Sequence, residues 1–197
     1  MAELLYQGHG SYRIDLADGR VLYVDPFAGE GYDKPADWIL VTHEHGDHNC
    51  VELPARKPGC RVITEKEALA GGVYQTIRED GLTIQAVEAY NKNHDRSCCV
   101  GYVLTLDGVK VYASGDTSET RCMHEMHSRQ LDYALYPIDG VYNMDAEEAS
   151  RCAQLVGARH SIPIHTKPGV LFDRASAEKF HAEGRIILAP GETLLLK

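Results

Sequence analysis

The sequence of 197 residues lacks the features that mark membrane and secreted proteins. It contains no run of about eighteen or more apolar residues, so no membrane span is expected. Its first residues, MAELLYQGHG, have neither the basic start nor the long apolar stretch of a secretory signal. The six cysteines form no C-x-x-C pair, and a chain of this length does not need disulfides. We therefore expect a cytoplasmic protein with reduced thiols and no membrane partner.

An excess of positive charge and a serine nucleophile motif are also lacking. Only 20 lysines and arginines stand against 29 aspartates and glutamates, which gives a formal net charge of -9. Nucleic-acid affinity rests largely on clustered basic residues, so the balance predicts a small-molecule substrate and no nucleic-acid partner. No G-x-S-x-G motif is present, so nothing indicates a serine nucleophile at a strand-to-helix elbow.

Apolar and β-branched runs in the first half predict strands. They cover residues 3–7, 11–16, 21–25, 38–42, 60–64 and 82–90. Asp18-Gly19 is a hairpin signal between two of them, and the stretch 65–80 has room for a short helix ended by Gly71-Gly72. This half is predicted to form one sheet, beginning with an antiparallel meander.

The second half mixes strands and helices in a single domain that we expect to span residues 1–197. Strands are predicted over 99–106, 109–114, 132–138 and 160–165, with a closing hairpin in 185–197. Helices are predicted over 118–127 and 173–184, and a third lies between its N-cap Asp145 and its stop signal Gly157. If each half supplies a sheet with helices packed outside, the fold is α/β, a four-layer αβ/βα sandwich.

The stretch VTHEHGDHNC carries the strongest chemical signal in the chain. Three histidines and an aspartate, His43, His45, Asp47 and His48, follow directly after the strand predicted over 38–42. Histidine nitrogens and carboxylate oxygens are the donors that zinc and other first-row metals prefer. A loop of this kind can turn the first two histidines to one metal ion and, after the flexible Gly46, Asp47 and His48 to a second.

Four ligands are too few for two metal ions, so the interpretation requires further donors at other strand ends. The sequence supplies His94 in NKNHD, Asp116 in GDT and His165 in PIH, each on a loop just after a predicted strand. Taken alone, a GDT motif is more typical of a turn, and a lone histidine of a hydrogen-bonded core residue. Their common placement is what favours a shared site.

The motifs of this chain are together similar to those of a known protein family. HEHGDH at 43–48, GDT at 115–117 and PIH at 163–165, in this order, resemble the metallo-β-lactamase superfamily. YQGHGSYRI, AYNKNHD, VGYVLTLDGVKVYASGDT and YNMDAEEA are more narrowly similar to small bacterial metal-dependent hydrolases of that fold, relatives of ascorbate-phosphate lactonase and N-acylphosphatidylethanolamine phospholipase D. The resemblance implies the αβ/βα sandwich with a dinuclear, usually zinc, centre between the two sheets.

The resemblance also implies a ligand set, position by position. It assigns His43, His45 and His94 to the first metal ion, Asp47, His48 and His165 to the second, and Asp116 to a bridge between them. In the loop of His94, however, Asp95, Cys98 and Cys99 are alternative ligands or packing residues. Relatives often carry a histidine just before GDT, where this chain has Ala113 and Ser114, so no role is carried over there.

Several other residues of the motifs are not expected to bind metal. His9 in GHGS either lines the pocket and orients a ligand or is purely structural. Glu44 is expected to point away from the site, and Tyr142 and Asn143 either line it or form the loop before the next helix. Three further histidines, His124, His127 and His181, lie outside strand ends and fit solvated or packing roles.

The predicted function is that of a dinuclear metal-dependent hydrolase in which a metal-bridging hydroxide attacks a small lactone, ester or phosphodiester. The expected cofactors are two divalent metal ions, zinc first, with manganese or iron as alternatives. Asp47 would orient the nucleophile and pass a proton to the leaving group, while Asp116 holds the ions together. The alternatives are an iron-dependent oxygenase or redox enzyme, a non-catalytic metal-binding module, and an RNA-processing nuclease; a homo-oligomer is compatible with all of them.

Overall fold

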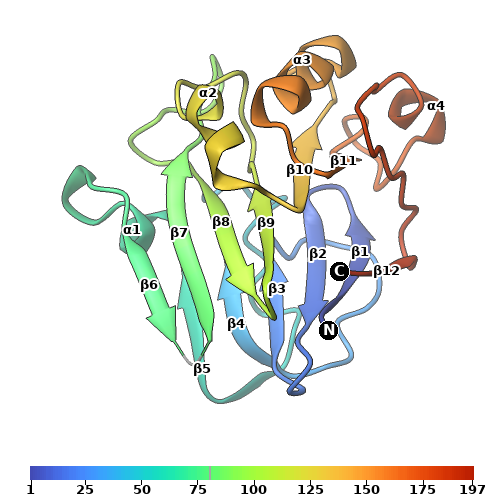
Figure 1. Cartoon of the computed structure of the whole chain (residues 1–197). Coiled ribbons are helices and arrows are strands. Elements are labelled where there is room, and N and C mark those ends of the chain that lie inside the picture. Colours follow the sequence, from blue (N-terminus) through green and yellow to red (C-terminus); the bar gives the residue numbers. More distant parts are fainter. Residues whose placement is uncertain (80) are drawn as a thin grey trace.

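The computed structural model describes residues 1–79 and 81–197 and places two six-stranded sheets face to face (Figure 1). The first sheet has the order β12-β1-β2-β3-β4-β5, with β1 Glu3–Gly8, β2 Ser11–Asp15, β3 Val21–Val24, β4 Ala36–Leu40, β5 Arg56–Ile63 and β12 Thr193–Leu195. The second has the order β11-β10-β9-β8-β7-β6, with β6 Thr76–Glu79, β7 Leu82–Glu88, β8 Val100–Leu106, β9 Val109–Ala113, β10 Tyr133–Pro137 and β11 His160–Ile164. Each half of the chain thus supplies one sheet, and the C-terminal β12 joins the first.

Tight turns connect the antiparallel strands where the sequence predicts them. β2 and β3 pair in antiparallel fashion around Gly19, whose φ of 86° is readily adopted only by glycine. β8 and β9 are joined by Asp107 and Gly108, with φ values of 48° and 80°. Positive φ at both residues is what a two-residue type I′ turn requires, and this turn matches the twist of the strands.

Part of each sheet is parallel, which brings the carboxyl ends of those strands to one edge of the sandwich. β3, β4 and β5 are parallel in the first sheet, and β9, β10 and β11 in the second. Strands in parallel sheets are covered on both faces and read as continuous apolar runs. VLYV in β3 and YALYP in β10 are buried at every position. The loops after these strands therefore meet at the upper edge in Figure 1.

The main core lies between the two sheets. Tyr6 and Tyr12 from the first sheet and Tyr102 from the second are buried there together with the aliphatic side chains of both. The hydroxyl of Tyr102 donates a hydrogen bond to the carbonyl of Val41 over 2.9 Å. This hydrogen bond connects β8 with Val41, which lies two positions before His43, the first residue of the histidine motif.

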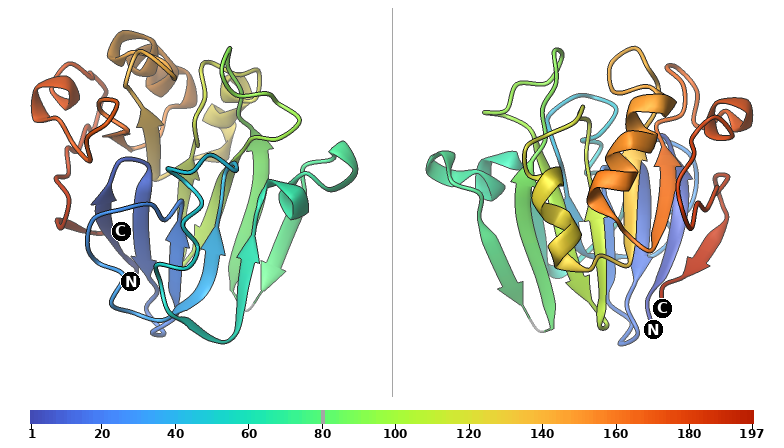
Figure 2. Two further views of the ribbon diagram at one scale, coloured as in Figure 1. Left: turned by 180° about the vertical axis from the view of Figure 1, so that it is seen from behind. Right: turned by 45° about the horizontal axis from the view of Figure 1, so that its top comes forward.

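Outer layers complete the sandwich, which confirms the fold predicted from the sequence. On the second sheet, α2 (Met123–Met126) and α3 (Ala146–Val156) cover the outer face, as Figure 2 shows. On the first sheet, the loop residues Tyr32 and Val51 pack against Val21, Tyr23 and Ile39. The outer layer of the N-terminal half is therefore built mainly from connecting loops.

The helices are mostly shorter than predicted. α3 has the predicted bounds, because the Asp145 carboxylate accepts from the N–H of Glu148 over 2.8 Å and Gly157 ends it in the left-handed conformation. The short helix predicted in 65–80 is α1 (Glu65–Ala68), and a separate 3-10 turn at Ala70–Gly72 follows it. The helix predicted over 118–127 shrinks to α2, because the N–H of Cys122, which would donate to the carbonyl of Ser118 in such a helix, donates instead to Oε2 of Glu88. Among the described residues, no helix is long and apolar enough to cross a bilayer.

The C-terminal region departs most from the prediction. The helix predicted over 173–184 is the single turn α4 (Arg174–Ala177), because the Arg185 guanidinium donates to the carbonyls of Glu178 and Phe180. The closing hairpin is wrong: Arg185 forms a bridge with Ser161 beside β11, whereas β12 pairs with β1. The two arms thus contribute to different sheets. The prediction over 65–80 also missed β6, which pairs with β7 as an edge strand.

Candidate metal centre

The histidine motif forms a tight loop after β4 and gathers its side chains above the edge of the sandwich. His43 is buried, His45 is exposed, and the N–H of His48 donates to the carbonyl of His45 over 2.9 Å to close the turn. The ring of His43 lies 4.6 Å from that of His45 and 4.9 Å from that of His94. One nitrogen of each of these three rings lies within 4.8 Å of the others, which forms a first cluster of donors.

A second cluster forms where the same loop meets β11 and the turn between β1 and β2. Asp47, His48 and His165 offer donor atoms within 4.8 Å of one another, and His9 joins them. His165 follows β11 directly with a φ of 46°, a left-handed conformation uncommon for a residue with a side chain. Its N–H donates to the carbonyl of His9 over 2.8 Å, which fixes this conformation.

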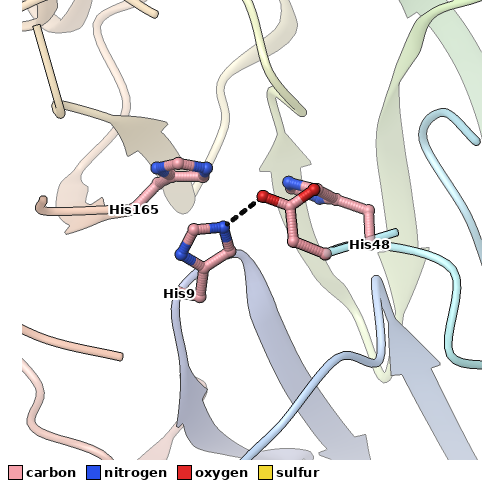
Figure 3. A group of neighbouring side chains, drawn as sticks. His9, His48 and His165 are labelled. Atoms are coloured by element: carbon pink, nitrogen blue, oxygen red, sulfur yellow. Dashed lines mark hydrogen bonds and ion pairs between the residues drawn. The ribbon is translucent and has the colours of Figure 1, made fainter. Parts of the chain in front are cut away.

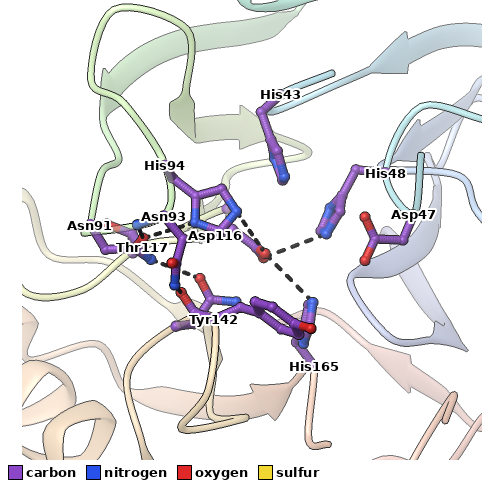
Figure 4. A network of polar contacts seen from close by, with 12 residues as sticks. His43, Asp47, His48, Asn91, Asn93, His94, Asp116, Thr117, Tyr142 and His165 are labelled. Atoms are coloured by element: carbon purple, nitrogen blue, oxygen red, sulfur yellow. Dashed lines mark hydrogen bonds and ion pairs between the residues drawn. The ribbon is translucent and has the colours of Figure 1, made fainter. Parts of the chain in front are cut away.

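Asp116 lies between the two clusters on the loop after β9 (Figure 4). Its Oδ1 is 3.5 Å from Nε2 of His48, and its Oδ2 is 3.4 Å from Nε2 of His94 and 3.5 Å from Nε2 of His165. It also forms a third group of donors with His43 and His48. A buried carboxylate in contact with histidines from both clusters is placed as a bridging ligand would be.

Four buried histidines of the two clusters, His43, His48, His94 and His165, share a second property: an oxygen atom lies beside Nδ1, the ring nitrogen that faces away from Asp116. Nδ1 of His43 lies 3.0 Å from Oγ1 of Thr42, and Nδ1 of His48 lies 2.9 Å from Oδ2 of Asp25. Nδ1 of His94 lies 2.9 Å from Oδ1 of Asn91, and Nδ1 of His165 lies 3.2 Å from Oδ2 of Asp139. Metal-binding histidines almost always place a carboxylate, carbonyl or water in this position, because it fixes the ring and its tautomer. The pattern therefore points to Nε2 as the binding atom.

The titration behaviour of four of these groups suits metal ligands. Burial, together with the nearby His48, lowers the pKa of His43 to about 2, and burial also lowers the pKa of His94, so both rings are neutral. Burial opposes the charge of Asp116, but His48 and His165 outweigh it and hold the pKa of that carboxyl well below its usual range. A hydrogen bond from His9 lowers the pKa of Asp47. Neutral imidazoles and ionised carboxylates are the forms that bind metal.

Two buried nitrogen atoms test whether the residues present fit a metal ion. Nε2 of His43 and Nε2 of His48 have no hydrogen-bond partner among the described residues, although both atoms are shielded from water. An unsatisfied buried polar atom costs free energy and calls for an explanation. A metal ion bound at these atoms would satisfy both, so the donor set fits the group.

His9 is more closely engaged than a lining residue would be (Figure 3). Its Nε2 lies 3.0 Å from Oδ2 of Asp47, and its ring centroid lies 3.6 Å from that of His165. Phe27 covers another side of the ring at 5.3 Å. His9 thus contacts two of the predicted ligands, and this geometry favours an orienting role over a purely structural one.

A small cavity opens onto the donors. Its volume is about 160 Å³, and it is lined by His45, Asp47, Asn93, His94, Asp116, Tyr142 and His165. Tyr142 is 52% exposed, so its ring forms part of the rim. The cavity gives small molecules access to atoms of both clusters.

The structure brings together all seven side chains predicted to bind metal, from four separate loops. The alternatives to His94 lie elsewhere: the Asp95 carboxylate accepts from Ser97 in its own turn, and Cys98 is exposed. Burial raises the pKa of the Cys99 thiol, which disfavours the thiolate that a metal would need. Glu44 points away as expected, with hydrogen bonds from Asn49 and Lys66.

Sequence reasoning missed the residues that hold the histidines. Asp25 follows β3 in VLYVDP, Asp139 follows β10 in YPIDG, and Asn91 follows β7. Each is a polar residue on a loop just after a strand, which is the same signal that identified Asp116. The remaining histidines, His124, His127, His160 and His181, lie outside the metal-donor groups found among the described residues.

Comparisons with known proteins agree with this geometry. The chain matches the family model described as Beta-lactamase superfamily domain over residues 3–165. A UPF0173 metal-dependent hydrolase from Thermococcus onnurineus is 31% identical over 228 aligned residues, which cover 100% of both chains. The match therefore includes every residue of the two clusters.

Solved structures show the same similarity. Igni18, described as a novel metallo hydrolase from Ignicoccus hospitalis, is 26% identical with a TM-score of 0.78, over 98% of this chain and 97% of that one. A protein described as a putative metal-dependent hydrolase from Parabacteroides distasonis is 26% identical with a TM-score of 0.74, over 94% of this chain and 90% of that one. Both similarities extend over nearly the whole fold.

Proposed function

The chain belongs to the β-lactamase superfamily domain family and is a metal-dependent hydrolase, and on this premise we propose that it uses two divalent metal ions, zinc first, to hydrolyse a small lactone, ester or phosphodiester. The proposal concerns the number and identity of the ions and the class of bond. The observation that carries it is the position of Asp116, which contacts histidines of both donor clusters.

The residues divide between two binding positions. His43, His45 and His94 would hold one ion, Asp47, His48 and His165 the other, and Asp116 would contact both. When bound, the two ions would supply a water molecule of lowered pKa and would polarise the carbonyl or phosphoryl oxygen under attack. Asp25, Asn91 and Asp139 keep the rings turned so that Nε2 faces the shared space.

Asp47 is the residue best placed to move a proton. Its side chain is 41% exposed and lines the cavity, whereas Asp116 is buried. His9 donates to Oδ2 of Asp47, so the carboxylate is held in one orientation with Oδ1 left to accept a proton from the attacking water. The same atom would then return the proton to the leaving oxygen.

The lining of the cavity supports a small polar substrate. Its residues include no lysine or arginine, so no side chain in the lining would neutralise an extended polyanion. Asn93 and Tyr142 offer amide and phenol groups that can bind substrate oxygen atoms. With a volume of about 160 Å³, the cavity suits the reacting group of a small lactone or ester better than a polymer.

The proposal is tested by metal content and hydrolysis together. Protein purified without chelator is analysed by elemental mass spectrometry and assayed on a panel of lactones, carboxylic esters and phosphodiesters. We expect about two zinc ions per chain and turnover of at least one class. Asp116→Ala should lose both metal and activity, because it removes the carboxylate that contacts both clusters.

Glu44→Gln is the matched control. Glu44 lies inside HEHGDH, but its carboxylate binds Lys66 and Asn49 on the surface, so metal content and turnover should stay unchanged. Failure to bind metal even after reconstitution would overturn the proposal. Two iron ions and consumption of oxygen would replace it with the oxygenase alternative.

A further inference from the structure

A continuous chain of polar contacts joins the two donor clusters behind the metal-facing atoms. His165 Nδ1 lies 3.2 Å from Asp139 Oδ2, and Asn143 Nδ2 donates to the same oxygen over 2.8 Å. Asn91 Nδ2 donates to Asn143 Oδ1 over 3.0 Å, and Asn91 Oδ1 lies 2.9 Å from His94 Nδ1. Four contacts thus connect a histidine of one cluster with a histidine of the other.

The hydrogen bonds in this chain of polar contacts can point in only one direction, and Asp139 sets that direction. An ionised carboxylate only accepts hydrogen bonds, so the end of Asn143 that faces Asp139 must be its NH₂ group. The Asn143 carbonyl oxygen then faces Asn91 and must receive that residue's NH₂ group. This leaves the Asn91 carbonyl oxygen facing His94, so His94 carries its proton on Nδ1.

Asp139 is held as a carboxylate by its surroundings. Its side chain is 0% exposed, and burial opposes the charge. Its Oδ1 nevertheless accepts from the backbone N–H groups of Tyr142 and Asn143, over 2.6 Å and 3.3 Å, and hydrogen bonds to the charged form favour it. The N–H of Val141 also donates to it, over 2.8 Å. Asp139, at which this chain of polar contacts begins, is therefore charged and fixed in orientation.

Resting on the proposed function above, we infer that Asp139 and Asn143 are positioning residues that fix the Nδ1 proton of both His165 and His94, and thereby prepare one ligand of each metal ion. His165 is fixed directly and His94 at a distance, through Asn143 and Asn91. One buried carboxylate thus sets the tautomer of rings in both clusters.

The position of Asp116 explains why the ring protons of His94 and His165 must be held on Nδ1. Nε2 of His94 and Nε2 of His165 lie 3.4 Å and 3.5 Å from the same oxygen of Asp116. A proton on either Nε2 would be attracted to that carboxylate and would block metal binding. Holding the proton on Nδ1 removes this competing tautomer, because a neutral imidazole has only one proton to place.

The inference is tested by NMR on zinc-loaded protein labelled with ¹⁵N at histidine. A ring proton that is hydrogen-bonded and buried exchanges slowly with water, so the Nδ1–H signals of His94 and His165 are expected in the unmodified protein. Asn143→Leu keeps a side chain of similar size but can neither donate nor accept. We expect the Nδ1–H proton of His94 to exchange roughly tenfold faster, as the loss of about one net hydrogen bond would give, while that of His165, which Asp139 contacts directly, should change little.

Asn91→Leu cuts the chain of polar contacts next to His94. It removes the amide oxygen that faces Nδ1 of His94 but leaves Asp139 against His165. The signal of His94 should therefore change while that of His165 stays. This variant also serves if Asn143→Leu does not fold.

Asn93→Leu is the matched control. Asn93 lies in the same loop as Asn91 and donates to the carbonyl of Tyr142 over 2.8 Å, but it is not part of the chain that links the rings. Both histidine signals should persist in this variant. Zinc content is measured throughout, because failure to bind two zinc ions overturns the proposed function and the inference with it. Two bound zinc ions with an unchanged His94 signal in Asn143→Leu overturn the inference alone.

Discussion

Asp25 Oδ2 lies 2.9 Å from Nδ1 of His48, although the two residues are 23 positions apart and both side chains are buried. The same carboxylate accepts from the N–H and from the hydroxyl of Thr42, each over 2.7 Å. Asp25 therefore fixes a predicted metal ligand and the start of the histidine loop at once. Its own φ of 46° shows that the chain turns sharply to place it.

Replacement of Asp25 should weaken metal binding and the fold. In Asp25→Ala, His48 loses the partner of Nδ1, and removing such a partner typically lowers metal affinity by about 10–100-fold. Breaking a buried pair by removing one member also destabilises by about 3–5 kcal/mol. Zinc affinity by chelator competition and urea unfolding measure the two effects. Asp33→Ala, which removes a carboxylate that is 72% exposed, should change unfolding by about 1 kcal/mol or less.

His9 should affect turnover more than metal content. His9→Phe keeps a ring that can pack on His165 and Phe27 but removes the N–H that holds Asp47. Because Asp47 would then lose its fixed orientation, we expect kcat to fall on the order of 100-fold with a smaller change in KM. Steady-state kinetics on the substrate found in the panel, with zinc content alongside, provide the measurement. Unchanged kcat at full zinc content would limit His9 to a packing role.

The metal-free protein should lose stability as the pH rises above neutrality. Burial opposes the charge of His48, but Asp116 and Asp25 outweigh it and raise the pKa to about 9, and Asp116 also raises the pKa of His165. In the unfolded chain these pKa values are near 6.5, so above about pH 6.5 the native state binds more protons. The free energy of unfolding therefore falls from about pH 6.5 to 8.5.

Urea unfolding of chelator-treated protein across this range checks the sign. The lowered pKa values of His43 and His94 act only below about pH 6.5, where they reduce stability as the pH falls. His48→Gln removes the histidine whose pKa is raised to about 9, so its slope above pH 6.5 should be shallower. Stability that rises with pH in the unmodified metal-free protein is incompatible with a protonated His48.

Gly10 should tolerate no side chain. A Cβ atom at Gly10 would lie 2.7 Å from Cε1 of His48, and His48 is held by Asp25 and cannot move aside easily. Gly10→Ala should therefore displace His48 and reduce the zinc bound at the second position. Gly46→Ala is the control, because Gly46 lies inside the histidine loop with open space around its Cβ position. Equal zinc content in the two variants would show that His48 adapts.

The sequence predicted much of the fold because many of its signals are local. The Asp107-Gly108 turn needs two residues with positive φ, and α3 needs a carboxylate at Asp145 and a glycine at 157. Such features depend on a few consecutive residues. The closing hairpin failed for the complementary reason: residues 193–195 are extended as expected, but their hydrogen bonds go to β1 at the other end of the chain.

For the site, the sequence by itself determined which residues offer metal donors and that they follow strands, because donor chemistry and strand patterns are properties of short segments. Only the tertiary structure decided which oxygen holds which ring: Asp25 for His48, Asn91 for His94 and Asp139 for His165. These pairings depend on distances between loops at the ends of different strands. The packing of two sheets sets those distances, and no local pattern contains them.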